Sequence, residues 1–272
     1  MSQAERWHLG GNAPEIYQHY LVPAIFGPWA PLLTEQAKLR AGERVLDIGC
    51  GTGVVARHAA QQVGASGQVI GLDINPGMLE VARSLPPIEG ATVEWREGDA
   101  IHLAFPDERF DAVFSQLGLQ YFSDRVQALR EIRRVLAPGG RVVLLVWRAI
   151  AHSPGFAAIA ETLDKHVSVA AGDVMRAPFV FGDEITELHD LFRCAQFTQV
   201  RIHSDVRMVR FESPEALVQY QVAGSPLAGH VAQVNDETRI ALIRDVCDAM
   251  QFYENDAGVA FPIEGHIAVA CP

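Results

Sequence analysis

Cysteine is scarce in this chain, and the few cysteines lie far apart. The 272 residues include four of them, Cys50, Cys194, Cys247 and Cys271, without any paired short spacing. The sequence therefore predicts neither a disulfide framework nor a zinc cage, and no spacing of histidines and carboxylates suggests another metal site. We expect four reduced thiols and no bound metal.

Long apolar runs are also missing. No stretch approaches the roughly 20 apolar residues that a membrane-spanning helix needs. The first 30 residues lack the basic start and the apolar stretch of a secretory signal. We expect a cytoplasmic chain without a membrane span.

Basic residues are outnumbered by acidic ones. The chain has 22 lysines and arginines against 33 aspartates and glutamates, which gives a net charge of −11. This charge opposes general binding to nucleic acid or to anionic lipid, and no basic run is visible. The length fits one large domain or a core with a substantial appendage, and it leaves a homo-oligomer open.

Strands and helices alternate between residues 44 and 147. Short apolar runs predict five strands, at Arg44–Ile48, Gln68–Leu72, Thr92–Glu97, Phe110–Ser115 and Arg141–Trp147. Helical patterns separate several of them, at Val54–Gln62, Pro76–Ser84 and Asp124–Leu136. Near-continuous apolar strands in such an alternation are typical of a parallel sheet with helices on both faces.

A glycine-rich turn follows the first of these strands. In Gly49-Cys-Gly-Thr-Gly53 the glycines let the backbone turn tightly and approach a ligand. The helix that comes next presents free N–H groups. Open parallel sheets bind ligands outside the carboxyl ends of their strands, so the turn is a predicted ligand site.

Two acids narrow the choice of ligand. Asp73, about 20 residues beyond the turn, is placed to accept both hydroxyls of a ribose. Gly51-x-Gly53-x-x-Ala56 fits the dinucleotide fingerprint, so an NAD(P)-dependent oxidoreductase stays an alternative. Asp47, however, puts a carboxylate just before the turn, which disfavours a pyrophosphate and attracts an ammonium or a sulfonium. No lysine follows Gly53, which excludes a phosphate-binding P-loop. An adenosine with a positive group and no phosphates fits best, and S-adenosylmethionine is such a compound.

Five ordered motifs carry a family resemblance. They are Val45-Leu-Asp-Ile-Gly-Cys-Gly-Thr-Gly53, Leu72-Asp-Ile-Asn-Pro-Gly-Met-Leu79, Gly98-Asp99-Ala100, Phe110-Asp-Ala-Val-Phe-Ser-Gln116 and Arg134-Val-Leu-Ala-Pro-Gly-Gly140. Together they resemble class I S-adenosylmethionine-dependent methyltransferases, and among these the type 11 family, which includes ubiquinone and menaquinone methyltransferase-like enzymes. The resemblance implies a methyltransferase with S-adenosylmethionine as its cofactor. A non-catalytic regulatory protein that binds S-adenosylmethionine would share the same motifs and is a second alternative.

The resemblance also implies which residues hold the adenosine half of the cofactor. Asp73 should hold the ribose diol, and Ile74 and Met78 should flank the adenine. Asp99 should accept a hydrogen bond from the adenine amino group, with the Ala100 amide nearby.

The methionine half is assigned in the same way. Gly49, Gly51 and Gly53 should line it, and Asp47 should act on its ammonium group. Gln116 and the backbone of Leu117, after the fourth strand, should lie where the methionine end and the acceptor meet.

The remaining segments predict the division of the chain and its fold. In chain order they are an N-terminal helical cover (1–40), the cofactor-binding core (41–148), a lid insertion (149–182), a core helix and strand (183–211), a second lid insertion (212–260) and a final core strand (261–272). In the cover, Asn12 is expected to cap a helix that Pro23 ends. The expected fold is α/β, with a doubly wound, mostly parallel seven-stranded sheet and helical lid insertions.

The composition of the two lid segments indicates what kind of acceptor the protein binds. They combine apolar residues with few charges, which predicts a small, partly apolar organic acceptor with an oxygen, carbon or nitrogen nucleophile. Methyl transfer is an in-line displacement that profits from a dry site and from close placement of the reactants. A phenol or carbon acid also profits from a base. His152, just beyond the fifth strand, and Tyr17, in the expected first helix, are the candidate catalytic residues.

Overall fold

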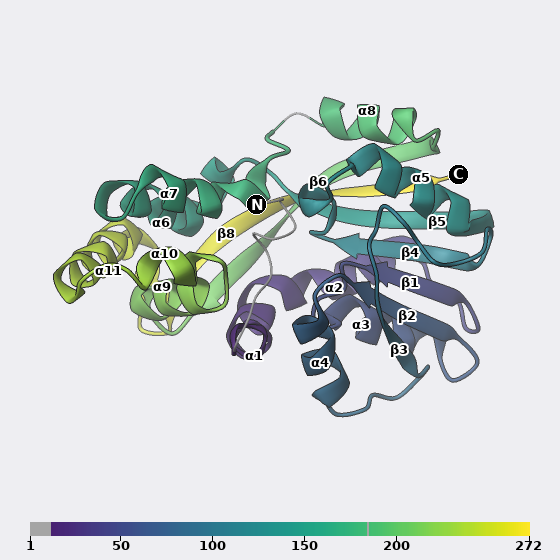
Figure 1. Ribbon diagram of the computed structural model, residues 1–272, viewed down its shortest axis with the longest axis horizontal. Coiled ribbons are helices and arrows are strands. Elements are labelled where there is room, and N and C mark those ends of the chain that lie inside the picture. Colours follow the sequence, from purple (N-terminus) through teal and green to yellow (C-terminus); the bar gives the residue numbers. More distant parts are fainter. Residues whose placement is uncertain (1–11, 184) are drawn as a thin grey trace. The chain divides into compact units, whose positions relative to one another are not determined.

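The computed structural model describes residues 12–183 and 185–272, and these form two compact units. The sheet unit comprises Gly27–Val146, Asp183–Asp205 and Gly265–Pro272. The helical unit comprises Trp147–Gly182, Val206–Glu264 and the described part of Met1–Phe26. The division falls inside strands β6 (Thr198–Phe211) and β8 (Gly258–Cys271), and each unit is described by itself (Figure 1).

The sheet has the strand order β3-β2-β1-β4-β5-β8-β6. The strands of its first part are β1 (Arg44–Ile48), β2 (Gln68–Asp73), β3 (Val93–Glu97), β4 (Phe110–Gln116) and β5 (Leu136–Trp147). Every neighbouring pair among these five is parallel, which confirms the predicted mostly parallel α/β sheet. A two-residue strand that the sequence analysis did not predict, β7 (Glu254–Asn255), pairs antiparallel with β8.

The strand order reverses between β1 and β4. From β1 the chain moves through α3 (Val54–Val63) to β2, whereas from β4 it moves through α5 (Arg125–Val135) to β5, in the opposite direction. Because such crossovers are almost always right-handed, opposite directions put the two helices on opposite faces of the sheet. The reversal is therefore the point where an open sheet of this kind binds ligands.

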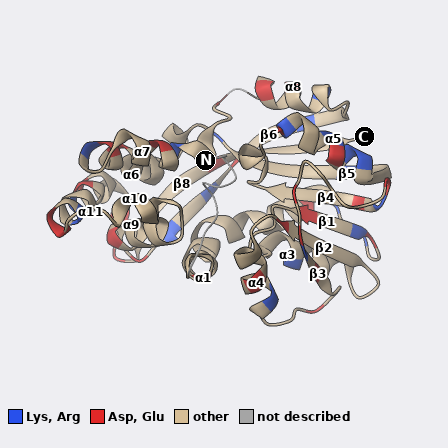
Figure 2. Cartoon of the chain, in the orientation of Figure 1, with Lys and Arg blue, Asp and Glu red and all other residues tan. Residues whose placement is uncertain are grey.

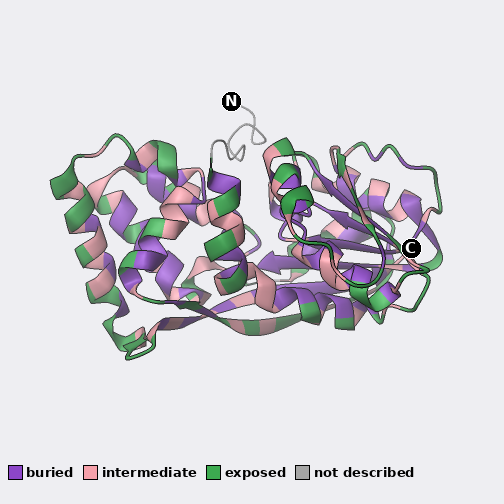
Figure 3. Cartoon of the chain, turned by 90° about the horizontal axis from the view of Figure 1, so that it is seen from below, coloured by how far each residue is buried: buried purple, intermediate pink, exposed green. Residues whose placement is uncertain are grey.

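Further helices complete the sheet unit. Helix α2 (Ala30–Ala37) packs against α3, and α4 (Pro76–Ser84) packs against β2 and β3. Helix α8 (Thr186–Cys194) packs against α5. Each of these helices has both buried and exposed positions, as amphipathic helices on a sheet require. Figure 3 shows buried and exposed residues side by side on the helices of the chain.

The start of β5 differs from its prediction. Helix α5 ends at Val135, capped at its other end by the Asp124 side chain, and Leu136 already belongs to β5 instead of the helix. Leu136 pairs with Phe110, and the register shifts before Ala112 pairs with Arg141. The strand therefore begins before Pro138-Gly139-Gly140, which lies between the predicted helix and the predicted strand. The shift in register accommodates these residues within β5.

The N-terminal helix also differs from its prediction. A short α1 (Ala13–Ile16) continues into a π-helix, η2 (Tyr17–Phe26), and Pro23 lies inside it instead of ending it. The Asn12 side chain makes no cap hydrogen bond. Prolines and π-type turns are the usual causes of departures from α-helical geometry, and here both occur in one segment. Residues 1–11 of the predicted cover lie outside the described residues.

The helical unit is built from α-helices that pack on one another. Helix α6 (Pro154–His166) packs against α7 (Val169–Arg176) and α11 (Asp236–Met250), and α9 (Pro214–Ala223) packs against α10 (Leu227–Val231) and α11. Short 3-10 turns complete it, at η5 (Ile150–His152), η6 (Ala177–Phe179) and η7 (Gln251–Tyr253). Its core holds Phe156, whose ring contacts those of Phe179 and Phe261.

Charge is spread over many elements. Figure 2 shows acidic and basic residues interspersed along the helices, α11 among them. Within residues 12–183 and 185–272, no helix is long and apolar enough to cross a bilayer.

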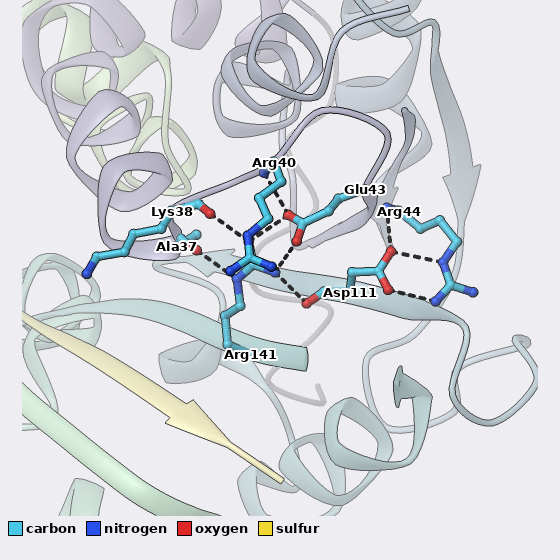
Figure 4. A network of polar contacts seen from close by, with 7 residues as sticks. All are labelled: Ala37, Lys38, Arg40, Glu43, Arg44, Asp111 and Arg141. Atoms are coloured by element: carbon cyan, nitrogen blue, oxygen red, sulfur yellow. Dashed lines mark hydrogen bonds and ion pairs between the residues drawn. The ribbon is translucent and has the colours of Figure 1, made fainter. Parts of the chain in front are cut away.

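A polar network joins the amino ends of the strands, at the edge away from the ligand end (Figure 4). The Arg141 guanidinium pairs with Glu43 at 2.6 Å and donates to the backbone carbonyls of Ala37 at 2.7 Å and Asp111 at 3.0 Å. Asp111 in turn pairs with Arg44 at 2.7 Å. The network ties β1, β4, β5 and the end of α2 together, and so holds the scaffold on which the ligand end depends.

Replacing Arg141 by methionine should lower the free energy of unfolding by about 1.5 kcal/mol, because three backbone carbonyls lose a donor and the Glu43 carboxylate keeps only the Arg40 amide. Urea unfolding measures this change. Arg193→Met is the matched control, since the Arg193–Asp190 pair is 76% and 55% exposed and should change stability by less than about 0.5 kcal/mol. Equal losses in the two variants would contradict a structural role for the network.

Candidate functional site

The turns after β1 and β4 meet at the reversal of strand order. The Gly49 and Cys50 amides both donate to the Leu72 carbonyl, at 2.8 and 3.1 Å, so the first turn is fixed to the end of β2. A Cβ on Gly49 would lie 3.5 Å from the Gly118 Cα and 3.9 Å from the Phe122 ring. These two turns therefore lie in contact.

Gly53 ends the first turn at a position where there is no room for a side chain. Its φ of +92° lies in the left-handed region, and a Cβ there would come within 2.2 Å of the Trp95 indole from β3. No other residue type fits this position without displacing the ring. The backbone of the turn therefore stays bare of side chains where α3 begins.

Asp47 is a buried carboxylate with one unused oxygen. It is 1% exposed, and its Oδ2 accepts the Ala56 amide at 3.0 Å, while Oδ1 has no partner among the described residues. Burial, together with the negative charge of Asp73, raises the pKa of its carboxyl to about 7, against the lowering by the Ala56 N–H. Thr52 Oγ1 is also buried without a described partner. A bound cation with hydrogen-bond donors would satisfy this carboxylate, so these residues fit the ammonium end of the expected cofactor.

Asp73 joins the first turn to the end of β2. Its Oδ2 accepts the Gly51 amide at 2.7 Å, and its Oδ1 accepts the Asn75 amide at 2.8 Å. Helix α4 is capped by Asn75, whose Oδ1 accepts the Gly77 amide at 2.9 Å. Asp73 is thus not the helix cap. A carboxylate oxygen can accept more than one hydrogen bond, so these backbone contacts are compatible with the predicted ribose contact.

The predicted adenine residues surround the same region. The Gly98 amide donates to the Asp73 carbonyl at 3.0 Å, which places the turn carrying Asp99 beside Asp73. Asp99 Oδ1 accepts the Ile101 amide at 3.1 Å, and Ala100 is buried. Met78 is buried, whereas Ile74 is 44% exposed, as an apolar residue that a planar base would cover.

The end of β4 contains a strained residue. Leu117 has a φ of +62°, which is rare for a residue with a Cβ, and its amide donates to the Leu145 carbonyl at 2.8 Å. Such strain persists where the surrounding structure imposes it, often at functional sites. Gln116 is the last residue of β4, directly before it. Both predicted residues therefore lie at the switch point.

Two buried polar residues of this region were not predicted. Ser115 is fully buried, and its Oγ has no partner among the described residues. Gln120 is 1% exposed, and its side chain interacts with the phenol of the neighbouring Tyr121. The signal in the sequence was a single polar side chain, Gln120, within the otherwise apolar and aromatic segment 117–122.

Cys50 lies in the first turn, and its side chain is buried. Burial raises the pKa of its thiol, and the nearby carboxylates of Asp73 and Asp47 raise it further. The structural role that its position suggests is consistent with these surroundings.

The two predicted catalytic residues belong to the helical unit. Tyr17 stacks on Phe26 with ring centroids 4.9 Å apart. His152 ends η5, and its Nδ1 lies 3.6 Å from an oxygen of Glu264, whose other oxygen pairs with Arg148. Their catalytic roles stay predictions.

Comparisons with known proteins give one consistent result. A family model described as a methyltransferase domain matches residues 46–144. The ubiquinone/menaquinone biosynthesis C-methyltransferase UbiE of Hahella chejuensis is 42% identical over 119 residues, which cover 43% of this chain and 48% of that protein. The UbiE protein of Burkholderia mallei is 33% identical over 229 residues, which cover 83% of this chain and 89% of that protein.

The solved structures agree on the fold. A putative methyltransferase from an antibiotic biosynthesis pathway of Anabaena variabilis has a TM-score of 0.66 at 17% identity, covering 90% of this chain and 97% of that one. The matches to several curated relatives, the Hahella protein among them, span about half of each relative's length.

Proposed function

Because the chain belongs to the type 11 family of class I S-adenosylmethionine-dependent methyltransferases, we propose that it transfers a methyl group from S-adenosylmethionine to a small, partly apolar organic acceptor. One observation above all supports this reading. The buried Asp47 carboxylate keeps an unpartnered oxygen beside a glycine turn at the switch point of the sheet. A diphosphate would be repelled there, whereas a nucleoside that carries a cation would be held.

The residues of the sheet unit divide the binding of the cofactor among them. The three glycines of the turn let the backbone reach the methionine portion, and Asp47 holds its ammonium. Asp73 accepts hydrogen bonds from the ribose, while Ile74 and Met78 cover the faces of the adenine. Asp99 accepts a hydrogen bond from the adenine amino group, beside Ala100. When bound, S-adenosylmethionine supplies an activated methyl group on a sulfonium centre.

Positioning and exclusion of water are the main work of the protein in such a transfer. A sulfonium loses its charge during the displacement, so a dry site lowers the barrier, and holding the reactants in line supplies much of the rest. Gln116 and the strained Leu117 lie at the point where the acceptor would meet the methionine end. At this point a site that aligns the reactants and excludes water matters more than acid and base groups.

His152 is our candidate for removing a proton from an acceptor hydroxyl. The Glu264 carboxylate near its Nδ1 would favour the tautomer with a proton on that atom, in which Nε2 is the basic nitrogen. Tyr17 is the second candidate, as an aromatic cover or hydrogen-bond donor to the acceptor.

A phenol or a quinol-like ring is the acceptor class we favour. The relatives from Hahella and Burkholderia carry names that refer to ubiquinone and menaquinone biosynthesis. The segments between β5 and α8 and between β6 and β8 are rich in apolar residues, which suits such a ring.

Two titrations and one turnover assay test the proposal. We expect S-adenosylhomocysteine to bind the purified protein in the micromolar range and NADH to bind at least 100-fold more weakly, because Asp47 repels its diphosphate. Labelled S-adenosylmethionine should then transfer methyl to a member of a panel of phenols, quinols and amines. Tight binding of NADH alone would favour an oxidoreductase. Binding of S-adenosylhomocysteine without turnover across the whole panel would favour a non-catalytic regulatory protein.

A further inference from the structure

Glu264 lies between a guanidinium and an imidazole. Its Oε2 accepts a hydrogen bond from Arg148 Nη1 at 2.5 Å, and its Oε1 lies 3.6 Å from His152 Nδ1. The two oxygens of one carboxylate thus face two different side chains. All three residues belong to the helical unit, and their side chains are between 21% and 29% exposed. Part of each side chain is therefore accessible from solvent.

Arg148 is attached to Glu264 at two points. Its backbone amide donates to the Glu264 carbonyl at 3.0 Å, in addition to the contact between guanidinium and carboxylate. Arg148 directly follows β5, and Glu264 lies in β8, the neighbouring strand. A guanidinium is planar and its N–H groups have fixed directions, so it restricts the orientation of a carboxylate that it binds. The Glu264 side chain therefore has little freedom to turn away from His152.

The backbone that carries His152 is also fixed. The His152 amide donates to the Ala149 carbonyl at 3.0 Å, and the Ala149 amide donates to the Gly182 carbonyl at 3.1 Å. The 3.6 Å between His152 Nδ1 and the carboxylate is longer than a hydrogen bond, and catalytic hydrogen bonds often tighten only when the reactants are bound. Because a partly exposed ion pair contributes little to stability, the main effect of this arrangement is on orientation.

We infer that Arg148 and Glu264 are positioning residues: Arg148 holds the carboxylate against His152, and the carboxylate keeps the imidazole proton on Nδ1. The inference rests on the proposed function and adds Arg148 to it. His152 Nε2 accepts the proton of the acceptor hydroxyl while the hydroxyl oxygen forms its bond to the methyl carbon. The electron pair of the broken carbon–sulfur bond stays on sulfur. The imidazolium that results is balanced by the Glu264 carboxylate.

Nitrogen-15 NMR of the imidazole tests the positions of these groups without any ligand. At a pH high enough for the ring to be neutral, we expect His152 of the native protein to be mainly the Nδ1–H tautomer. Glu264→Gln should lower this fraction about twofold, because a neutral amide attracts the proton less and can itself donate to Nδ1. Arg148→Met should lower it by a smaller factor, because the carboxylate is then free to turn. His152→Gln identifies the resonances.

Methyl transfer to catechol, as a phenol of the panel, is the second measurement. Glu264→Gln should lower kcat about tenfold and Arg148→Met about threefold, with KM within about twofold of native. Since Arg148 acts through Glu264, Arg148→Met should change nothing further in protein that already carries Glu264→Gln. Arg148→Lys keeps the charge and should recover part of the loss. Arg176→Met removes the pair with Asp164 in the same unit, and as the matched control it should keep the native tautomer and rate.

Several results would overturn the inference. They are a native His152 that is mainly the Nε2–H tautomer, a native tautomer or a native rate in folded Glu264→Gln, and an undiminished effect of Arg148→Met in the Glu264→Gln background. Glu264→Asp, which shortens the side chain and withdraws the carboxylate, is the second variant if Glu264→Gln does not fold. Failure of native protein to bind S-adenosylhomocysteine is a separate result, which overturns the proposed function. The tautomer measurement needs no cofactor and still decides how His152 is held.

Discussion

Replacing Asp73 by alanine should weaken the binding of S-adenosylhomocysteine about 100-fold. The ribose would lose its charge-assisted hydrogen bonds to the carboxylate. The Gly51 and Asn75 amides would lose the acceptor to which they now donate at 2.7 and 2.8 Å. Both losses act on the same ligand, because the Gly51 amide belongs to the turn that approaches the cofactor. Isothermal titration calorimetry measures the change directly.

Two further variants separate these contributions. Glu80→Ala, at an exposed position of α4, controls for the removal of a negative charge near the site and should leave the affinity within twofold of native. Asp73→Asn keeps an acceptor for one backbone amide and should lose about tenfold. If Asp73→Ala bound S-adenosylhomocysteine as the native protein does, Asp73 would have no place in the cofactor site.

The affinity for S-adenosylhomocysteine should rise about tenfold between pH 6 and pH 8, because Asp47 must be ionised to hold an ammonium group. In the free protein burial raises the pKa of this carboxyl to about 7, so most of it is protonated at pH 6 and most is ionised at pH 8. Asp47→Asn should remove this pH dependence and lower the affinity at pH 8 about thirtyfold. Calorimetry in two buffers of different ionisation enthalpy should also show proton release by the native protein at pH 6.

The ionisation of the same carboxyl lowers the stability of the free protein, whereas it raises the affinity for the ligand. Its pKa is raised on folding, so from about pH 4 to pH 7 the folded chain holds a proton that the unfolded chain has released, and the free energy of unfolding falls as the pH rises through this window. Asp47→Asn should therefore be more stable than native protein at pH 8 and closer to it at pH 5. A native affinity that does not change between pH 6 and pH 8 would contradict the assignment of Asp47 to the ammonium.

Much of the sheet and of the cofactor end was predictable from the sequence because it depends on local signals. These signals are glycines before a helix, an acid at the end of each of two strands, and apolar runs of strand length. Each can be recognised from a few neighbouring residues in the sequence. Even here one detail required coordinates. The sequence places Asp73 and Asn75 two residues apart before the same helix, and only the structure shows that Asn75 makes the cap.

The misses all involve contacts between distant segments or unusual backbone. Leu136 fits a helical pattern, but its pairing with Phe110 draws it into β5. Pro23 is a helix terminator by propensity, yet it lies inside a π-helix. Gln120 looks like an ordinary polar residue after a strand, because its burial is a property of the packed chain. None of these features leaves a periodic signal in the sequence.

The indole of Trp95 links the outermost strand of the sheet to the cofactor turn. It lies where a side chain on Gly53 would be, and equally where one on Gly71 in β2 would be, at 2.2 and 2.4 Å from the respective Cβ positions. Relatives that have replaced the tryptophan are therefore the ones in which Gly71 is free to diverge, whereas the φ of +92° still favours glycine at position 53.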